Sequence, residues 1–197
     1  MSLLLPANPQ PSTALPRPLT FGGNQESSLG GPSTPVHRVG DRYALDVVIS
    51  RMSHADAAIW ASVLTRAIRE DARMPWPQPG IVIGSPGAAL IDGAGQTGST
   101  IALRAMTPGY TVQQGQFFSI LQAGVRSLHH AIAPTVVNGA GKAVLAIWPM
   151  LRIVTLDGSP CNFTAPEIEG ELVGAEQGIR LIRARADALS FSIVERE

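Results

Sequence analysis

Residues 89–110 decide the fold, and they read "ALIDGAGQTGSTIALRAMTPGY". Their glycine-rich part, "GAGQTG" (93–98), has the spacing G-x-G-x-x-G with which dinucleotide-binding folds bring the backbone close to a pyrophosphate. Such a site also needs a helix directly after the glycines and an acidic residue about 20 positions further on. Here Pro108 and Gly109 soon interrupt the following segment, and residues 114–120, "QGQFFSI", contain no acidic side chain. We therefore predict that the glycines form a turn between strands, and we expect no cofactor.

From Gly80 onward, short apolar segments alternate with connectors rich in Gly, Asn, Asp and Pro, a pattern typical of strands joined by turns. Up to Leu151 this pattern predicts an antiparallel β-sandwich or barrel. The expected strands are IVIG (81–84), STIALRAM (99–106), QFFSILQ (116–122), LHHAIAPTVV (128–137), KAVLAIWPML (142–151), IRLIRARA (179–186) and ALSFSIVE (188–195).

One strand and the one convincing helix precede this region. Residues 42–50, "RYALDVVIS", alternate between apolar and polar side chains, as in a half-buried strand. Ser53 is a good N-cap for a helix at about 53–73, and Asp56 suits its first turn. Because a single helix lies before the strands and does not alternate with them, a βαβ architecture is excluded. The predicted fold class is mainly β with one α-helix (α+β).

Residues 1–37 are expected to form an extended, proline-rich N-terminal arm. Seven prolines lie within the first 35 residues, and proline excludes a helix and disfavours a central strand. The arm is either a disordered tail or an extension that crosses onto a neighbouring subunit. Residues 38–197 are then expected to form one mainly-β domain that carries the helix.

The composition favours a surface that other proteins cover. Hydrophobic residues make up 45% of the chain, but charged residues only 15%, against about 25% in an ordinary soluble domain. A formal net charge of zero argues against a surface that attracts nucleic acid or anionic lipid. No apolar run is long enough to cross a membrane, and the first residues do not resemble a signal peptide. We expect synthesis in the cytoplasm and no membrane insertion.

No pattern of catalytic or metal-binding residues is evident. His129 and His130 are adjacent on an expected strand, so their side chains point to opposite faces and cannot bind one metal ion. Cys161 is the single cysteine, which excludes an internal disulfide, and we expect it to be a buried apolar side chain. Three alternating glutamates are interpreted as the solvated face of a strand: Glu167, Glu169 and Glu171. We therefore predict that the protein is not an enzyme and has no metal site.

Several of these segments, taken in order, resemble a family of tail proteins of long-tailed bacteriophages and prophages. The resemblance covers about residues 38–195. It rests on "RVGDRYALDV", an "A.IWASVL" helix, "IDGAGQTGSTIAL", "VQQGQFFSI", "LHHAIAPTVVNGAGKAVLAIWPMLR" and "ALSFSIVERE". The sequence is similar to distal tail proteins, which form a ring between the tail tube and the tip or baseplate.

This resemblance implies a structural subunit of the virion tail, assembled in the host cytoplasm. Its expected partners are further copies of itself in a ring, with a hexamer favoured, and the tube, hub and tip proteins of the tail. A receptor- or carbohydrate-binding β-domain at the tail tip is the first alternative, and a hydrolase ranks last. The candidate interface residues are Leu4, Leu5, Phe21, Trp76, Tyr110, Phe117 and Trp148.

Overall fold

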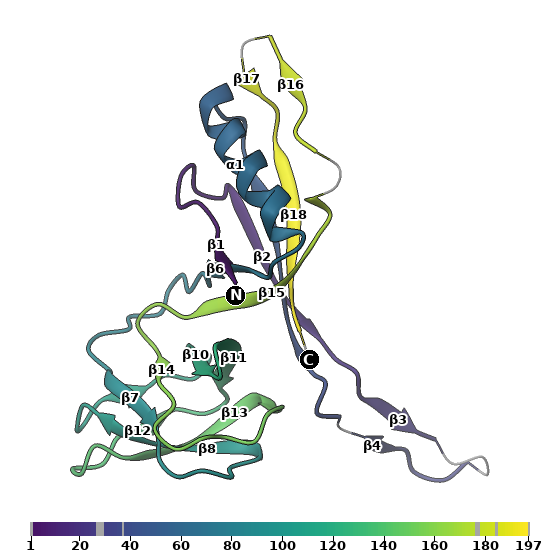
Figure 1. Cartoon of the computed structure of the whole chain (residues 1–197). Helices are drawn as coiled ribbons and strands as arrows, with labels where there is room; N and C mark the ends of the chain where they lie inside the picture. The colour runs from purple at the N-terminus through teal and green to yellow at the C-terminus, as the bar shows by residue number, and fades with distance from the viewer. Residues whose placement is uncertain (1, 27–29, 37, 176–177, 184, 197) are drawn as a thin grey trace.

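The computed structural model describes residues 2–26, 30–36, 38–175, 178–183 and 185–196 (Figure 1). The chain is mainly β with one helix, and it contains an antiparallel barrel, as the sequence predicted. Its apolar side chains form two cores rather than one. The first core lies between helix α1 and a six-stranded sheet, here called the open sheet. The second fills the barrel.

The open sheet has the strand order β1-β6-β15-β18-β5-β2. Among these strands only β1 and β6 pair in parallel. On β5 the predicted alternation is confirmed, because Tyr43, Leu45, Val47 and Ile49 are all buried. Its strands are β1 (Leu3–Leu4), β2 (Thr13–Leu19), β5 (Arg42–Ile49), β6 (Ala72–Pro75), β15 (Glu167–Val173) and β18 (Leu189–Glu195).

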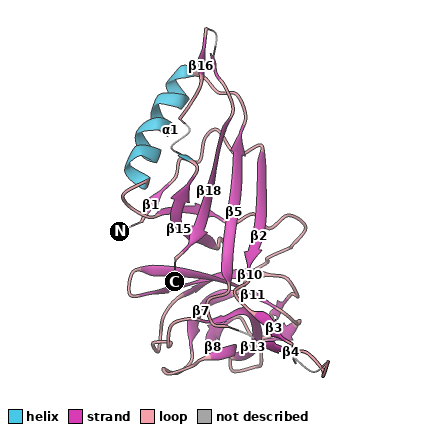
Figure 2. Cartoon of the chain, turned by 90° about the vertical axis from the view of Figure 1, so that its right-hand side faces the viewer, coloured by secondary structure: helices cyan, strands magenta, loops and turns pink. Residues whose placement is uncertain are grey.

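Helix α1 (His54–Ala67) covers one face of the open sheet, and Figure 2 shows it beside the long strands. Ser53 caps its N-terminus as predicted, and the Ser53 hydroxyl accepts a hydrogen bond from the Asp56 N–H. The predicted end at about residue 73 is wrong. Residues 72–75 form β6, because Ala72 and Met74 turn into the core while the backbone pairs with β1 and β15. The cross-strand pairing decides the structure there, against the helical spacing.

The N-terminal segment is extended, but its first half belongs to the open sheet. Strand β2 pairs with β5 from Thr13 to Leu19, and β1 pairs with β6. Both strands lie at edges of the sheet, which suits a segment with Pro16 and Pro18 because proline has no N–H to donate and is tolerated on edge strands. The first half of the expected arm is therefore part of the open sheet, while the expected boundary at residue 37 lies outside the described residues.

The barrel is inserted between β6 and β15, two strands that pair with each other. Its strand order is β14-β10-β11-β13-β8-β7. It is nearly closed, since Leu90 and Pro160 form a bridge and the Ile91 N–H donates to the Ser159 carbonyl at 3.0 Å. The expected strand at residues 81–84 is wrong, because this segment is an irregular connection into the barrel. The strands are β7 (Gly87–Ile91), β8 (Gly98–Met106), β10 (Phe117–Gln122), β11 (Val125–Ala131), β13 (Ala143–Leu151) and β14 (Cys161–Asn162).

Gly93, Gly95 and Gly98 form the turn between β7 and β8, each with a positive φ, and a strand follows them in place of a helix. A glycine adopts this backbone conformation without the steric cost that a Cβ would add. The Gln96 side chain holds the turn by accepting from the Ala102 N–H at 2.6 Å and donating to the Asp92 carbonyl at 3.0 Å. The prediction that these glycines form a turn is confirmed.

Two hairpins project from the body at its opposite ends (Figure 1). Strands β3 (Gly23–Gln25) and β4 (Thr34–Val36) form one, and β16 (Leu181–Ile182) and β17 (Arg185–Ala186) form the other. A third short pair, β9 (Thr111–Val112) with β12 (Thr135–Val136), lies against the barrel. Within the described residues, no helix combines the length and apolar composition needed to cross a membrane.

Candidate functional site

Three of the expected interface aromatics lie where the open sheet meets the barrel, one of them buried and two partly buried. Trp76, Phe117 and Trp148 surround Tyr43, and their ring centroids are 5.1, 5.3 and 4.9 Å from the centroid of its ring. His130 completes this aromatic cluster at 5.3 Å from Phe117. Trp76 is buried, and Phe117 and Trp148 pack against the core of the open sheet. These side chains therefore join two parts of one chain.

A hydrogen bond fixes the centre of the aromatic cluster. The Tyr43 hydroxyl lies 2.6 Å from Nδ1 of His130, on β11 of the barrel. Burial raises the pKa of Tyr43, and Glu195 adds to that effect. Burial also lowers the pKa of His130. Both shifts favour a neutral pair, in which the Tyr43 hydroxyl donates to the imidazole nitrogen.

A buried carboxylate ties the same junction together. Glu195, at the end of β18, accepts from the Tyr43 N–H at 2.8 Å and from the Leu128 N–H at 2.7 Å. The Arg152 guanidinium, after β13, lies 3.1 Å from the same carboxylate. Burial raises the pKa of Glu195, while Arg152 and the two backbone donors oppose that rise. One side chain thus binds the open sheet to two segments of the barrel.

A second ionic network crosses the junction, and it corrects the interpretation of the alternating glutamates. Arg126 on β11 lies 2.7 Å from Glu167 and 3.0 Å from Glu169 on β15. Arg73 also reaches Glu167, at 3.3 Å. Glu169 is only 6% exposed, so it is not part of a solvated face, whereas Glu171 is exposed. No local pattern could indicate this burial, because the arginine partner lies some 40 residues away.

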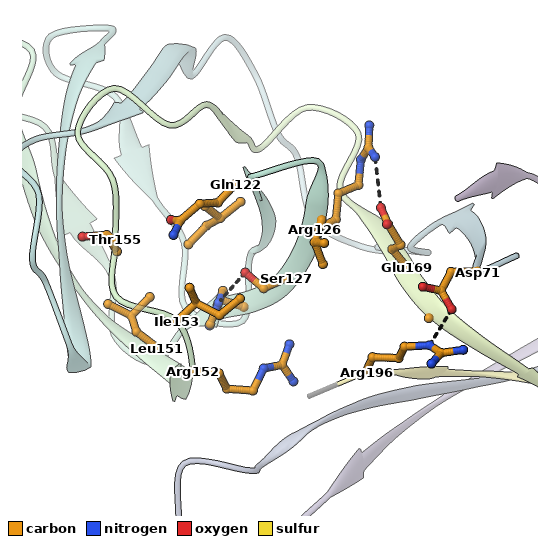
Figure 3. Close-up of a pocket in the computed structure, with 14 residues that line it drawn as sticks. Asp71, Gln122, Arg126, Ser127, Leu151, Arg152, Ile153, Thr155, Glu169 and Arg196 are labelled. Atoms are coloured by element: carbon orange, nitrogen blue, oxygen red, sulfur yellow. Dashed lines mark hydrogen bonds and ion pairs between the residues drawn. The ribbon is translucent and has the colours of Figure 1, made fainter. Parts of the chain in front are cut away.

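A small cavity lies beside these charges, and it is lined by the Ser127 hydroxyl, 3.2 Å from Nε2 of His129. Figure 3 shows Arg126 directed to Glu169 and Arg196 directed to Asp71. His129 is buried as well, and its Nδ1–H donates to the Pro149 carbonyl at 2.9 Å. Burial lowers the pKa of His129 to about 4. The cavity volume of about 40 Å³ has room for roughly one water molecule.

The described part of the chain contains neither a metal-binding group of side chains nor a reactive thiol. No group of three or more His, Cys, Asp or Glu side chains there could hold a metal ion. Cys161 is buried, as expected, and burial raises the pKa of its thiol to about 12. A thiol with such a pKa is a poor nucleophile at neutral pH.

The other interface candidates are divided between the interior and the surface. Leu5 is buried in the first core. Tyr110 packs against the barrel core, and its hydroxyl donates to the Ile83 carbonyl at 2.7 Å. Leu4 is 49% exposed and lines a groove of about 470 Å³ between the N-terminal segment and β6. Phe21 is also exposed.

Phe21 lies at the centre of an apolar surface where the β3–β4 hairpin meets the body. Phe21, Val36, Val39 and Ile153 are 43%, 40%, 51% and 51% exposed, and we call these four residues the Phe21 patch. Two hollows of about 420 and 510 Å³ adjoin it, and both are lined by Phe21 and Arg38. Val36, Val39 and Ile153 come from segments that the sequence pattern did not bring together.

The ring of Phe21 is held in this exposed position by two contacts. Its backbone N–H donates to the Asp41 carboxylate at 2.8 Å. The Arg42 guanidinium lies over the ring, 4.6 Å from the centroid, in a cation–π contact. A fixed aromatic ring surrounded by exposed valine and isoleucine is typical of a protein-binding surface.

No protein-family model matches the chain, and no curated protein matches it by sequence.

Proposed function

We propose that this protein is a structural subunit of a bacteriophage tail, which acts by self-assembly into a ring and by docking to other tail proteins. The observation that carries the proposal is the Phe21 patch, an apolar surface that neither core covers and that lies at the base of a projecting hairpin. The similarity of the sequence pattern to distal tail proteins supplies the biological setting, a ring between the tube and the tip or baseplate with six copies favoured.

The chemistry of the surface supports association rather than turnover. An exposed apolar patch is costly in water and is stabilised when a partner covers it. In a ring, a heterologous contact brings one surface of each copy against a different surface of the next. The charged groups that the structure brings together at the junction are engaged with one another. The tryptophans that a glycan-binding face would need lie in the first core or at its edge.

The experiment compares the mass of the particle that the full-length protein forms in solution with the mass of the particle that a patch variant forms. Phe21→Ser combined with Val39→Ser removes apolar area from the patch without touching either core. Val144→Ser is the matched control, because Val144 is 63% exposed on the barrel strand β13. We expect light scattering and native mass spectrometry to find an oligomer for the wild type and the control. For the patch variant, we expect the dissociation constant of the oligomer to be at least tenfold higher.

Two results would contradict the proposal. One is a wild-type protein that remains a monodisperse monomer at concentrations of tens of micromolar. The other is an equal loss of oligomer in the control and in the patch variant, which would show that the Phe21 patch has no special part in association. A glycan bound by the isolated monomer would instead favour a receptor-binding domain.

A further inference from the structure

The β16–β17 hairpin displays arginine and apolar side chains together, at the end of the molecule opposite the Phe21 patch. Leu181 is 67% exposed and Ile182 is 36% exposed. Arg180, Arg183 and Arg185 flank them and are all exposed. In the described part of the chain, none of these three guanidinium groups forms an ion pair. We call these five residues the basic hairpin.

The base of this hairpin is firmly attached, so its outer residues are held in place. Met52 and Ala186 exchange two backbone hydrogen bonds, of 3.3 and 3.0 Å. Nε2 of His54, in the first turn of α1, donates to the Ile182 carbonyl at 2.9 Å. Arg51 and Asp187 lie 3.5 Å apart at the same base. An attached base lowers the conformational entropy lost when the exposed residues bind a partner.

Within the described residues, a second copy of the chain has few unpaired carboxylates to offer the basic hairpin. Most acidic side chains of the described residues are engaged in ion pairs within the chain. These are Asp46, Glu70, Asp71, Asp92, Asp157, Glu167, Glu169, Asp187 and Glu195. Asp56 bonds to Ser53 and Asp41 accepts from the Phe21 N–H. Among the described acidic residues, Glu26 and Glu171 are exposed without such a partner; Glu26 follows β3 and Glu171 lies on β15.

We propose that the basic hairpin is the docking site for an acidic surface on a different protein. This inference rests on the proposed function, in which the ring subunit binds other tail proteins as well as its own copies. The partner supplies carboxylates for the three arginines and an apolar depression for Leu181 and Ile182. Arginine suits this contact because its planar guanidinium binds a carboxylate through two hydrogen bonds and is weakly hydrated.

Nucleic acid and membrane surfaces fit the basic hairpin less well. The described residues of β16–β17 and its turn include no aromatic side chain on which a base could stack. Three arginines make too few phosphate contacts for strong binding at physiological salt. Anionic membranes are bound through larger basic clusters, typically of four to eight cations. Exposed leucine and isoleucine between the arginines are typical of a protein interface instead.

The experiment uses the full-length protein and three labelled probes. The first is a 15-residue peptide of repeating Glu-Leu-Glu-Ser-Gly, which presents carboxylates and leucines together. The others are a 20-base-pair DNA duplex and vesicles with 30% anionic lipid. The hairpin variant is Arg180→Gln with Arg183→Gln and Arg185→Gln. The control is Arg66→Gln with Arg69→Gln, two exposed arginines at the C-terminal end of α1.

We expect the peptide to bind the wild type more tightly than either other probe. The hairpin variant should weaken peptide binding at least tenfold, and the control less than twofold. Leu181→Ser should weaken it several-fold with all three arginines present. Equal peptide binding by wild type and hairpin variant would overturn the proposal. So would tighter binding of the DNA or the vesicles with the same dependence on the three arginines.

The oligomeric state separates this proposal from the proposed function. The hairpin variant should form the same oligomer as the wild type, since the basic hairpin faces a different protein. Loss of the oligomer in the hairpin variant would assign the hairpin to self-association and overturn the inference. If the wild type is a monomer that still binds the peptide through the hairpin, this would contradict the proposed ring assembly but not the proposed docking site.

Discussion

The junction between open sheet and barrel and the basic hairpin use the same kinds of residue in opposite circumstances. At the junction Arg126 and Arg152 face glutamates, and Tyr43 sits among aromatic rings. At the hairpin, arginines and apolar residues stand exposed, and the described residues offer the arginines no carboxylate. The difference shows where the chain completes its own contacts and where it leaves them to a partner.

This comparison predicts two classes of variant. Changes at the junction should lower the free energy of unfolding, because they leave buried charges or donors without partners. Changes at the hairpin or the Phe21 patch should alter association and hardly affect unfolding. The following predictions test that division, beginning with the variant that should lose the most stability.

Glu195→Ala should be the most damaging change. It leaves Arg152 buried without a counter-charge, together with the N–H groups of Tyr43 and Leu128 without an acceptor. Removing one partner of a buried pair costs about 3–5 kcal/mol, which urea unfolding would measure. Glu195→Gln combined with Arg152→Met removes both charges and should lose less. A loss below about 1 kcal/mol in Glu195→Ala would show that the junction does not depend on this carboxylate.

His129 should make the protein less stable as the pH falls. Its pKa is about 4 in the folded protein and about 6.5 when unfolded, so only the unfolded state gains a proton between these values. The stability contribution is full above pH 6.5 and is lost as the pH falls towards 4, at up to about 1.4 kcal/mol per pH unit. His129→Asn keeps a donor for the Pro149 carbonyl and does not titrate, so its stability should fall less over this range. Thermal melts at pH 7, 6 and 5 would measure how steeply the stability of each protein falls with pH. An equal dependence on pH in the wild type and in His129→Asn would refute this account.

Tyr43→Phe should have an intermediate effect. It keeps the ring within the aromatic cluster and removes only the hydroxyl next to Nδ1 of His130. Leaving that nitrogen without a donor should cost about 1–2 kcal/mol. Trp148→Phe, which keeps the contact between the rings but reduces the buried area, is a useful comparison. If Tyr43→Phe unfolds at the same urea concentration as the wild type, packing alone holds the cluster together.

The hairpin variant and the patch variant should have the smallest effects on folding. Their side chains contribute little to either core, so each should change the free energy of unfolding by no more than about 0.5 kcal/mol per residue. Their effects should lie in peptide binding and oligomer formation instead. A hairpin variant that lost several kcal/mol would place these arginines with the junction and remove the contrast between the two regions.

Part of the candidate site could be predicted from the sequence. Phe21 was expected at an interface on its apolar character, and the structure places it on the surface. Trp76 was expected there too but is buried, because the cluster around Tyr43 needs a partner from both sides of the junction. The Phe21 patch and the basic hairpin as surfaces could not be predicted. Exposure depends on which distant segments leave a side chain uncovered, and no local pattern contains that information.

Features that depend on neighbours along the chain could be predicted from the amino-acid pattern alone. The Ser53 cap, the alternation along 43–49 and the glycine turn at 93–98 follow from backbone sterics and side-chain period. Long-range contacts, by contrast, make residues 72–75 a strand, join β2 to the sheet and bury Glu169. Each of these depends on a segment far away in the chain, whose position becomes fixed only when the two cores form.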